Sequence, residues 1–284
     1  MTQTFEALVF PYLNHAVRML ESGYATAADI DNAMRFGCGY PKGPLAELDE
    51  LGPAAVRDAL AARHAETGDH LHRPADLLER VAAENGSFTG GGDEGAAAPR
   101  LRHEIAKVGV VGTGTMASGI AQVFAQSGYD VLFVGRSEEK LAGVLAYVTR
   151  NLDRAIERGK SDEATKAAVL GRLVGTTDRA DLADVDLAVE AIAEDLAVKT
   201  ALVKDLDRIM KPGAILATTT SSLPITELAK ATGRPAEVIG MHFFNPAPVM
   251  RLVEIVTTEL TGADVDETIK ALTTGLGKVA AGRF

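Results

Sequence analysis

Two side chains late in the sequence could together move a proton. His242 stands in the stretch Met241-His-Phe-Phe-Asn-Pro246, whose aromatic residues could exclude water. Glu254 follows within the apolar run 251–256, where an isolated acid needs a partner. A histidine held by a carboxylate is the usual construction of a general base that works near neutral pH. The competing interpretation is a core histidine with an unrelated acid at a strand edge, and the spacing alone favours neither.

A second candidate is the run of hydroxyl side chains at residues 218–222, which includes Ser221. This run follows a predicted strand. Ligands of open α/β sheets bind at the carboxyl ends of the strands, so the hydroxyls could orient a small polar group. They could equally cap the helix that we expect to begin after Pro224.

A third candidate is a glycine-rich turn between a β-branched run and an apolar helical pattern. Gly112, Gly114 and Ala117 form the pattern Gly-x-Gly-x-x-Ala. The first glycine permits a tight turn, the second lets the backbone approach a pyrophosphate, and the alanine lets the helix pack on the strand. Because the N-terminus of a helix offers free N–H groups to phosphates, we predict a dinucleotide site. Its expected contacts are Gly112, Gly114, Thr115, Met116 and Ala117.

The end of the second predicted strand bears on the choice of cofactor. In this kind of fold that strand normally ends in an acid, which binds the ribose hydroxyls of NAD. Here it ends in Gly135 and Arg136, so the acid is missing. The Arg136 guanidinium could bind a 2′-phosphate, or it could be a solvated side chain at the start of a helix. We therefore expect NAD and consider NADP possible.

The elements that must position these residues alternate from residue 104 onward. Strands are predicted at 107–111, 131–134, 187–191, 215–218, 238–241 and 252–256, and helices at 118–127, 137–158, 164–170, 197–210, 225–230 and 265–276. This alternation predicts a mostly parallel, doubly wound α/β sheet of the Rossmann type. Leu272, Leu276 and Val279 are expected on one unfinished helical segment.

The first part of the chain reads differently, because its apolar residues recur at helical spacing from residue 5 to about 83. Thr26-Ala-Ala-Asp29 is a capping-box pattern that predicts a helix start. A glycine-rich stretch with few apolar residues follows and is typical of a linker. We predict an all-α domain at 1–84, a Gly/Ala-rich linker at 85–103 and a dinucleotide-binding domain at 104–284.

Composition excludes several classes of partner. The net charge of −10 argues against nucleic acid or an anionic membrane as a main partner. No apolar run is long enough to span a membrane, and the first residues do not form a signal peptide. Cys38 is the single cysteine, so we expect a reducing compartment and a cytoplasmic location. We expect no metal ion.

Several motifs together give a family resemblance. Residues 107–260 resemble the nucleotide-binding domain of the 3-hydroxyacyl-CoA dehydrogenases, above all the bacterial 3-hydroxybutyryl-CoA dehydrogenases. The matching stretches are Gly112-Thr-Gly-Thr-Met-Ala-Ser-Gly-Ile-Ala121, Val189-Glu-Ala-Ile-Ala-Glu194, Thr220-Ser-Ser-Leu223 and His242-Phe-Phe-Asn-Pro-Ala-Pro-Val-Met-Arg-Leu-Val-Glu254. The resemblance implies that His242 is the catalytic base and Glu254 the acid that orients it. It also implies substrate and nicotinamide contacts by Ser221 and Asn245, cofactor contacts by Glu194 and Lys199, and a CoA contact by Arg158.

The helical part resembles the C-terminal domain of the same family, but here it comes first. Its matching stretches are Phe10-Pro-Tyr-Leu-Asn14, Asp29-Ile-Asp-Asn-Ala-Met34 and Gly39-Tyr-Pro-Lys-Gly-Pro44. The order fits either the middle of a tandem protein or a permuted single unit. Two positions depart from the family pattern: Glu6 stands where the family has a substrate-contacting asparagine, and the stretch 86–90 lacks the family's basic residues.

These observations predict an oxidoreductase that interconverts 3-hydroxyacyl-CoA and 3-oxoacyl-CoA by hydride transfer with NAD or NADP. A nucleotide-binding assembly module without turnover is one alternative, and a β-hydroxy acid dehydrogenase that does not use CoA is another. The helical segment 5–83 carries more apolar surface than a small helical domain needs, so we expect self-association into a homo-oligomer through it.

Overall fold

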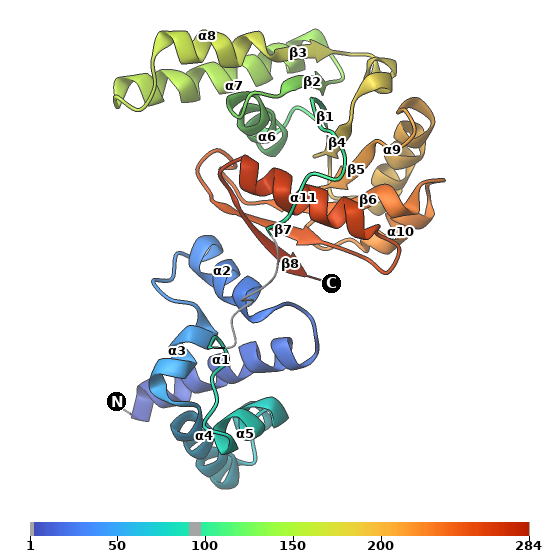
Figure 1. Ribbon diagram of the computed structural model, residues 1–284. Coiled ribbons are helices and arrows are strands. Elements are labelled where there is room, and N and C mark those ends of the chain that lie inside the picture. Colours follow the sequence, from blue (N-terminus) through green and yellow to red (C-terminus); the bar gives the residue numbers. More distant parts are fainter. Residues whose placement is uncertain (1–2, 91–97, 284) are drawn as a thin grey trace. The chain divides into compact units, whose positions relative to one another are not determined.

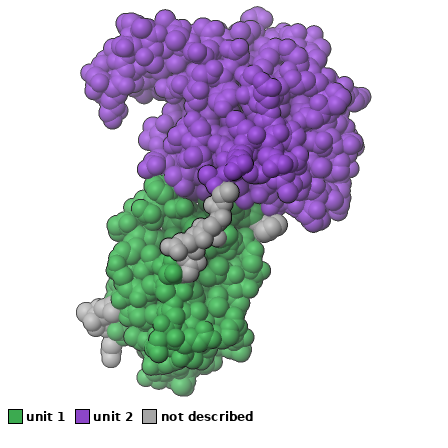
Figure 2. Space-filling view, viewed as in Figure 1, with its two compact units in different colours: residues 1–97, 281–284 green, residues 98–280 purple. Residues whose placement is uncertain are grey.

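The chain forms two compact units. A computed structural model describes residues 3–90 and 98–283. One unit comprises residues 1–97 with 281–284, and the other comprises residues 98–280 (Figures 1 and 2). The predicted fold class is confirmed, since helices precede a Rossmann-type α/β sheet in the chain. In the part of the chain that the structure describes, no helix is long and apolar enough to cross a membrane.

The described residues of the first unit form five α-helices and a short 3-10 helix. They are α1 (Gln3–Glu21), α2 (Ala27–Gly37), α3 (Pro44–Leu51), α4 (Pro53–Thr67), η1 (His70–His72) and α5 (Asp76–Ala83). Its core is mainly aliphatic, with Leu13, Val17 and Leu48 fully buried, and it includes the ring of Phe10. The predicted cap at Thr26 is present, because its hydroxyl accepts the N–H of Asp29 at 3.1 Å.

An aspartate from one helix caps the next helix in this unit. The buried carboxylate of Asp31, on α2, accepts the N–H of Leu45 at 2.8 Å and that of Ala46 at 3.0 Å. These N–H groups open α3 and have no partner inside the helix. A side chain at Gly43 would overlap the Asp31 carboxylate, so the glycine is what allows this approach. The stretch Gly39–Pro44 therefore joins α2 to α3 through a tertiary cap.

The ends of the predicted linker are held by side chains of their own units. Asp49 accepts the N–H groups of Phe88 and Thr89, each at 2.9 Å. On the other side, the Thr268 hydroxyl accepts the N–H of Arg102 at 3.0 Å. Residues 91–97 of the predicted linker 85–103 lie outside the described residues.

The described residues form one eight-stranded sheet in the order β3-β2-β1-β4-β5-β6-β7-β8, which belongs to the second unit except for residues 281–283 of its last strand. Its strands are β1 (Lys107–Val111), β2 (Asp130–Val134), β3 (Leu173–Thr176), β4 (Leu187–Glu190), β5 (Ile215–Thr218), β6 (Val238–Phe243), β7 (Leu252–Val256) and β8 (Val279–Arg283). Neighbours from β3 to β6 are parallel, and β7 is antiparallel to β6. The predicted Rossmann-type sheet is confirmed.

Helices cover both faces of the sheet, as a doubly wound fold requires. They are α6 (Thr115–Gln126), α7 (Glu138–Glu157), α8 (Glu163–Gly171), α9 (Leu196–Ile209), α10 (Ile225–Lys230) and α11 (Ala263–Gly275), with 3-10 turns η2 (Arg179–Asp184) and η3 (Pro235–Glu237). One apolar cluster joins the sheet to α6, α7, α8 and α11, and a second joins it to η2, α9 and α10.

The chain end differs from the expectation. Val279 was expected to continue an unfinished helical segment with Leu272 and Leu276, and this expectation is wrong. Helix α11 ends at Gly275, Gly277 takes a positive φ of 70°, and Val279 begins β8. The Val279 N–H donates to the carbonyl of Arg251 at 2.8 Å, so the last strand binds the start of the antiparallel segment.

Candidate active site

The glycine-rich turn joins β1 to α6 and leaves room for a ligand. Gly112 has a φ of 131°, and a Cβ there would lie 2.5 Å from the carbonyl oxygen of Ala191, so only glycine fits. A Cβ on Gly114 would meet nothing within 4 Å, and no side chain caps α6. Thr115, Met116 and the buried Ala117 form the first turn of this helix. The uncapped N–H groups beside open space fit a pyrophosphate.

The end of β2 carries no acid, as the sequence indicated. Gly135 is packed so closely that a Cβ there would lie 2.7 Å from Cγ2 of Thr113 and 2.8 Å from Cδ2 of Leu141. Arg136 is exposed, and within residues 3–90 and 98–283 its guanidinium has no hydrogen-bond or ion-pair partner. Ser137 caps α7 by accepting the N–H of Lys140 at 3.3 Å. The guanidinium is therefore available to a ligand.

The antiparallel pairing of β6 and β7 brings His242 and Glu254 together. The two residues are direct partners in the register. Nδ1 of His242 lies 2.8 Å from Oε2 of Glu254, and the side chains are 17% and 21% exposed. With Nδ1 donating to the carboxylate, Nε2 is left as the acceptor. The Phe244 ring packs against the imidazole edge at 4.8 Å between centroids.

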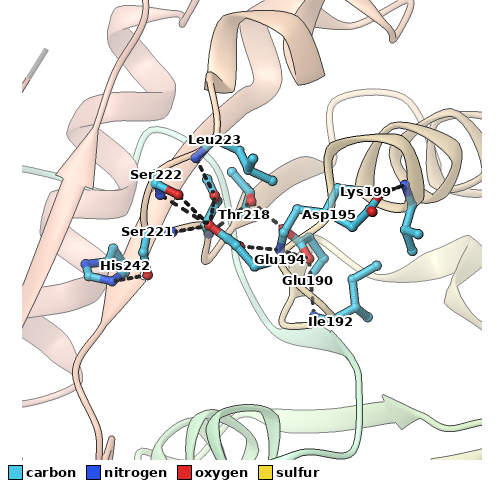
Figure 3. A network of polar contacts seen from close by, with 12 residues as sticks. Glu190, Ile192, Glu194, Asp195, Lys199, Thr218, Ser221, Ser222, Leu223 and His242 are labelled. Carbon is cyan, nitrogen blue, oxygen red and sulfur yellow. Dashed lines mark hydrogen bonds and ion pairs between the residues drawn. The ribbon is translucent and has the colours of Figure 1, made fainter.

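Ser221 lies on the other side of the imidazole. Its Oγ is 3.1 Å from Nε2 of His242, so the hydroxyl can donate to the nitrogen that Glu254 leaves unprotonated (Figure 3). Ser221 is exposed, whereas its neighbour Thr220 is buried. The geometry thus forms a line of hydrogen bonds from a carboxylate through an imidazole to an accessible hydroxyl. Such a line can carry a proton between a ligand and the histidine.

The hydroxyl cluster binds Glu194 and does not cap a helix. Helix α10 begins after Pro224 without a side-chain cap. Oε1 of Glu194 instead accepts the Thr220 hydroxyl at 2.5 Å. The same oxygen accepts the Ser221 N–H at 2.9 Å (Figure 3). Burial alone would raise the pKa of the Glu194 carboxyl, but these hydrogen bonds hold it below its usual value. An ionised carboxylate therefore holds the turn that carries Ser221.

Lys199 lies behind Glu194 and is almost fully buried. Its Nζ is 2.8 and 2.9 Å from the two carboxylate oxygens of Glu190 and 3.6 Å from Oε2 of Glu194. The Lys199 side chain is 1% exposed. Glu190 also accepts the Thr218 hydroxyl. Burial raises the pKa of the Glu190 carboxyl, and Lys199 and Thr218 oppose that rise.

The burial of Lys199 affects the cofactor contacts that the resemblance implied for Glu194 and Lys199. Glu194 is 41% exposed and open to a ligand, whereas the Lys199 ammonium is occupied by carboxylates inside the protein. Glu190 was absent from the sequence-based candidates. Its signal was an acid at the end of the apolar run Leu187–Glu190, the same feature that singled out Glu254.

Asn245 is exposed two residues after the end of β6, where its amide makes no hydrogen bond with the part of the chain that the structure describes. The loop that follows Asn245 is held by hydrogen bonds from Lys278. The Nζ of Lys278 donates to the carbonyls of Ala247 at 2.6 Å and Met250 at 2.8 Å. Burial and the nearby Arg251 charge lower the pKa of Lys278. The loop carrying Asn245 is therefore anchored at two carbonyls.

One predicted site residue, Arg158, has no contact with this network of described residues. Arg158 caps the C-terminus of α7 and is exposed, and no contact recorded for residues 98–283 joins its side chain to His242. Glu6 belongs to the helical unit, where it lines a cavity of about 410 Å³ with Arg63 and His72. Among the described residues no group of three His, Cys, Asp or Glu side chains could hold a metal ion.

Comparison with protein families gives the identity of the fold. Residues 107–281 match the family described as 3-hydroxyacyl-CoA dehydrogenase, NAD binding domain. The chain belongs to the 3-hydroxyacyl-CoA dehydrogenase family. Residues 5–97 match the C-terminal domain of the same family, so the two family domains occur here in the reverse order. The family resemblance drawn from the sequence motifs is confirmed.

Named relatives share the nucleotide-binding part. A 3-hydroxybutyryl-CoA dehydrogenase of Clostridioides difficile is 45% identical over 173 residues, covering 61% of this chain and 62% of the relative. A probable 3-hydroxybutyryl-CoA dehydrogenase of Deinococcus radiodurans is 48% identical over 170 residues, covering 58% and 61%. The crystal structure of (S)-3-hydroxybutyryl-CoA dehydrogenase from Ralstonia eutropha matches with a TM-score of 0.62 and 41% identity, covering 63% of each chain. The chain thus spans less than two thirds of these relatives.

Proposed function

We propose that this family member interconverts 3-hydroxyacyl-CoA and 3-oxoacyl-CoA with a nicotinamide cofactor. The observation that carries the proposal is the line of hydrogen bonds from Glu254 through His242 to Ser221, at 2.8 and 3.1 Å. This line of hydrogen bonds ends in an exposed hydroxyl, in the same unit as the glycine-rich turn. The relatives named 3-hydroxybutyryl-CoA dehydrogenase support a short acyl-CoA substrate.

In the oxidative direction, Nε2 of His242 takes the proton of the substrate's 3-hydroxyl group. The substrate hydroxyl replaces Ser221 as donor to Nε2, which frees the serine hydroxyl to donate to the substrate oxygen. Glu254 keeps Nδ1 protonated, orients the ring and stabilises the imidazolium that forms. The exposed amide of Asn245 adds a second polar contact to the substrate.

When bound, the cofactor supplies the hydride acceptor. Its pyrophosphate would lie on the turn formed by Gly112, Gly114 and the first residues of α6, including Thr115, Met116 and Ala117. Glu194 would contact the cofactor directly, and Lys199 would act on the cofactor through its ion pair with Glu194. We propose NAD, with NADP accepted as well, because Arg136 is unpartnered among the described side chains and no acid ends β2.

Further roles follow for residues outside the network. Arg158 is exposed and positively charged, so we propose that it contacts CoA phosphate. The chain is proposed to form a homo-oligomer, and Leu8 of the helical unit supports this, since this apolar residue is 72% exposed. The single cysteine, Cys38, supports a cytoplasmic protein.

Turnover of acetoacetyl-CoA with NADH and with NADPH tests the proposal. Oxidation of the cofactor that needs the CoA thioester is the expected result. Turnover of free acetoacetate at the same rate would assign the chain to β-hydroxy acid dehydrogenases that do not use CoA. Cofactor binding without any turnover would favour an assembly module, for which the negative charge of Glu6 at the family's asparagine position is the specific observation.

A further inference from the structure

The Glu190–Lys199 ion pair is almost completely buried, yet it stands one contact away from the proposed active site. Both side chains are essentially unexposed, at 0% and 1%. Two buried charges carry a large desolvation penalty, and a pair of apolar residues would fill the same space without it. A purely structural role therefore explains the pair poorly.

The contacts of the pair lead to Glu194 and from there to the turn that carries Ser221. Lys199 reaches past Glu190 to Oε2 of Glu194 at 3.6 Å. The other oxygen of Glu194 accepts the N–H groups of Ser221 at 2.9 Å and Ser222 at 3.2 Å. Figure 3 shows Glu194 between the lysine and the serine turn. One oxygen thus faces the buried charge, and the other faces the turn.

We propose that Lys199 and Glu190 are positioning residues, which fix the Glu194 carboxylate so that it holds the Ser221 hydroxyl against His242. The inference rests on the proposed dehydrogenase function. Lys199 is the counter-charge of Glu194, and Glu190 keeps the ammonium in place by binding it through both carboxylate oxygens. Thr218, the neighbour of Glu190 in the pairing of β4 and β5, donates its hydroxyl to that carboxylate. The pair is thereby tied to the rigid centre of the sheet.

The decisive variant removes both charges at once. Lys199→Met alone leaves Glu190 buried without a counter-charge and can unfold the protein. The double variant Glu190→Gln/Lys199→Met removes the unpaired charge and keeps an acceptor for Thr218. Asp207→Asn is the matched control, because Asp207 lies on the same helix α9 as Lys199 but outside the network of Figure 3. The substitution breaks a 2.7 Å ion pair between Asp207, which is 21% exposed, and Arg234, which is 14% exposed.

Amide hydrogen exchange of the free protein gives a readout that needs no turnover. We expect the Ser221 and Ser222 amides to lose protection by about tenfold or more in the double variant, while amides of the central strands stay unchanged. The control should leave the serine amides protected. Equal loss across the sheet, or no loss at the serines, would overturn the proposal and leave a structural role.

Kinetics supply the second readout. We expect kcat to fall by roughly 10- to 100-fold in the double variant, because a displaced hydroxyl misaligns the reacting groups, while KM for acetoacetyl-CoA changes little. In a Glu194→Gln background the same double change should add almost nothing, since Lys199 acts through Glu194. A full additive loss would overturn the proposal. If the parent protein does not turn over acyl-CoA, the proposed function fails, and the exchange result alone decides the positioning role.

Discussion

Glu254→Gln should slow the reaction without unfolding the protein. The substitution keeps the size of the side chain and an acceptor oxygen, but it removes the negative charge that lies 2.8 Å from Nδ1 of His242. In the oxidative direction the imidazole becomes positively charged during the step, so the carboxylate stabilises the transition state more than the free enzyme. Lowered kcat, with cofactor binding preserved, is the expected pattern.

The magnitude follows from the geometry. A hydrogen bond to a charged group contributes about 1.5–3 kcal/mol, which corresponds to roughly 10- to 150-fold in rate. The side chains are 17% and 21% exposed, so solvent screens the pair only in part. His242→Gln removes the base itself and should lower kcat by roughly 10²–10⁴-fold. The double variant should be no slower than His242→Gln, because both changes act on one step.

The assay is cofactor reduction with 3-hydroxybutyryl-CoA at saturating substrate, with circular dichroism and cofactor binding as checks on folding. Asp264→Asn is a suitable control, because it breaks another histidine–carboxylate pair, His103 with Asp264 at 2.9 Å, in the same unit. A folded Glu254→Gln protein with the parent kcat would refute the reasoning. So would losses that multiply in the double variant.

Three further predictions concern cofactor choice, stability and assembly. Arg136→Ala should reduce kcat/KM for NADPH more than for NADH; a strong NADH preference that the substitution leaves unchanged would remove Arg136 from phosphate binding. Asp31→Ala should destabilise the helical unit by about 2 kcal/mol in urea unfolding, since it leaves a buried N–H of Leu45 without its acceptor. Asp31→Asn should lower the free energy of unfolding by less, because the amide keeps an acceptor oxygen. Light scattering should give more than one chain per particle, and a clean monomer with full turnover would contradict self-association.

The sequence alone was sufficient to predict segments whose structure depends only on their own residues. The glycine-rich turn was predictable because a positive φ and an open approach need glycine at Gly112 and Gly114. The strands Ile215–Thr218 and Leu252–Val256 were predicted with the bounds that the structure has, since each is an apolar run. Strand β3 was missed because it lies at the edge of the sheet and is not a buried apolar run, with Val174 58% exposed.

Tertiary structure decided which candidates meet. The spacing of His242 and Glu254 left open whether they meet, and only the family pattern paired them; the antiparallel register of β6 and β7 makes them neighbours. It indicated Lys199 only through the family pattern, and the structure placed its ammonium against Glu190, inside the protein. The physical reason is that propensity and periodicity describe one segment at a time. The register between two strands and the partner of a buried charged group both depend on segments far apart in the chain, so only the packed sheet determines them.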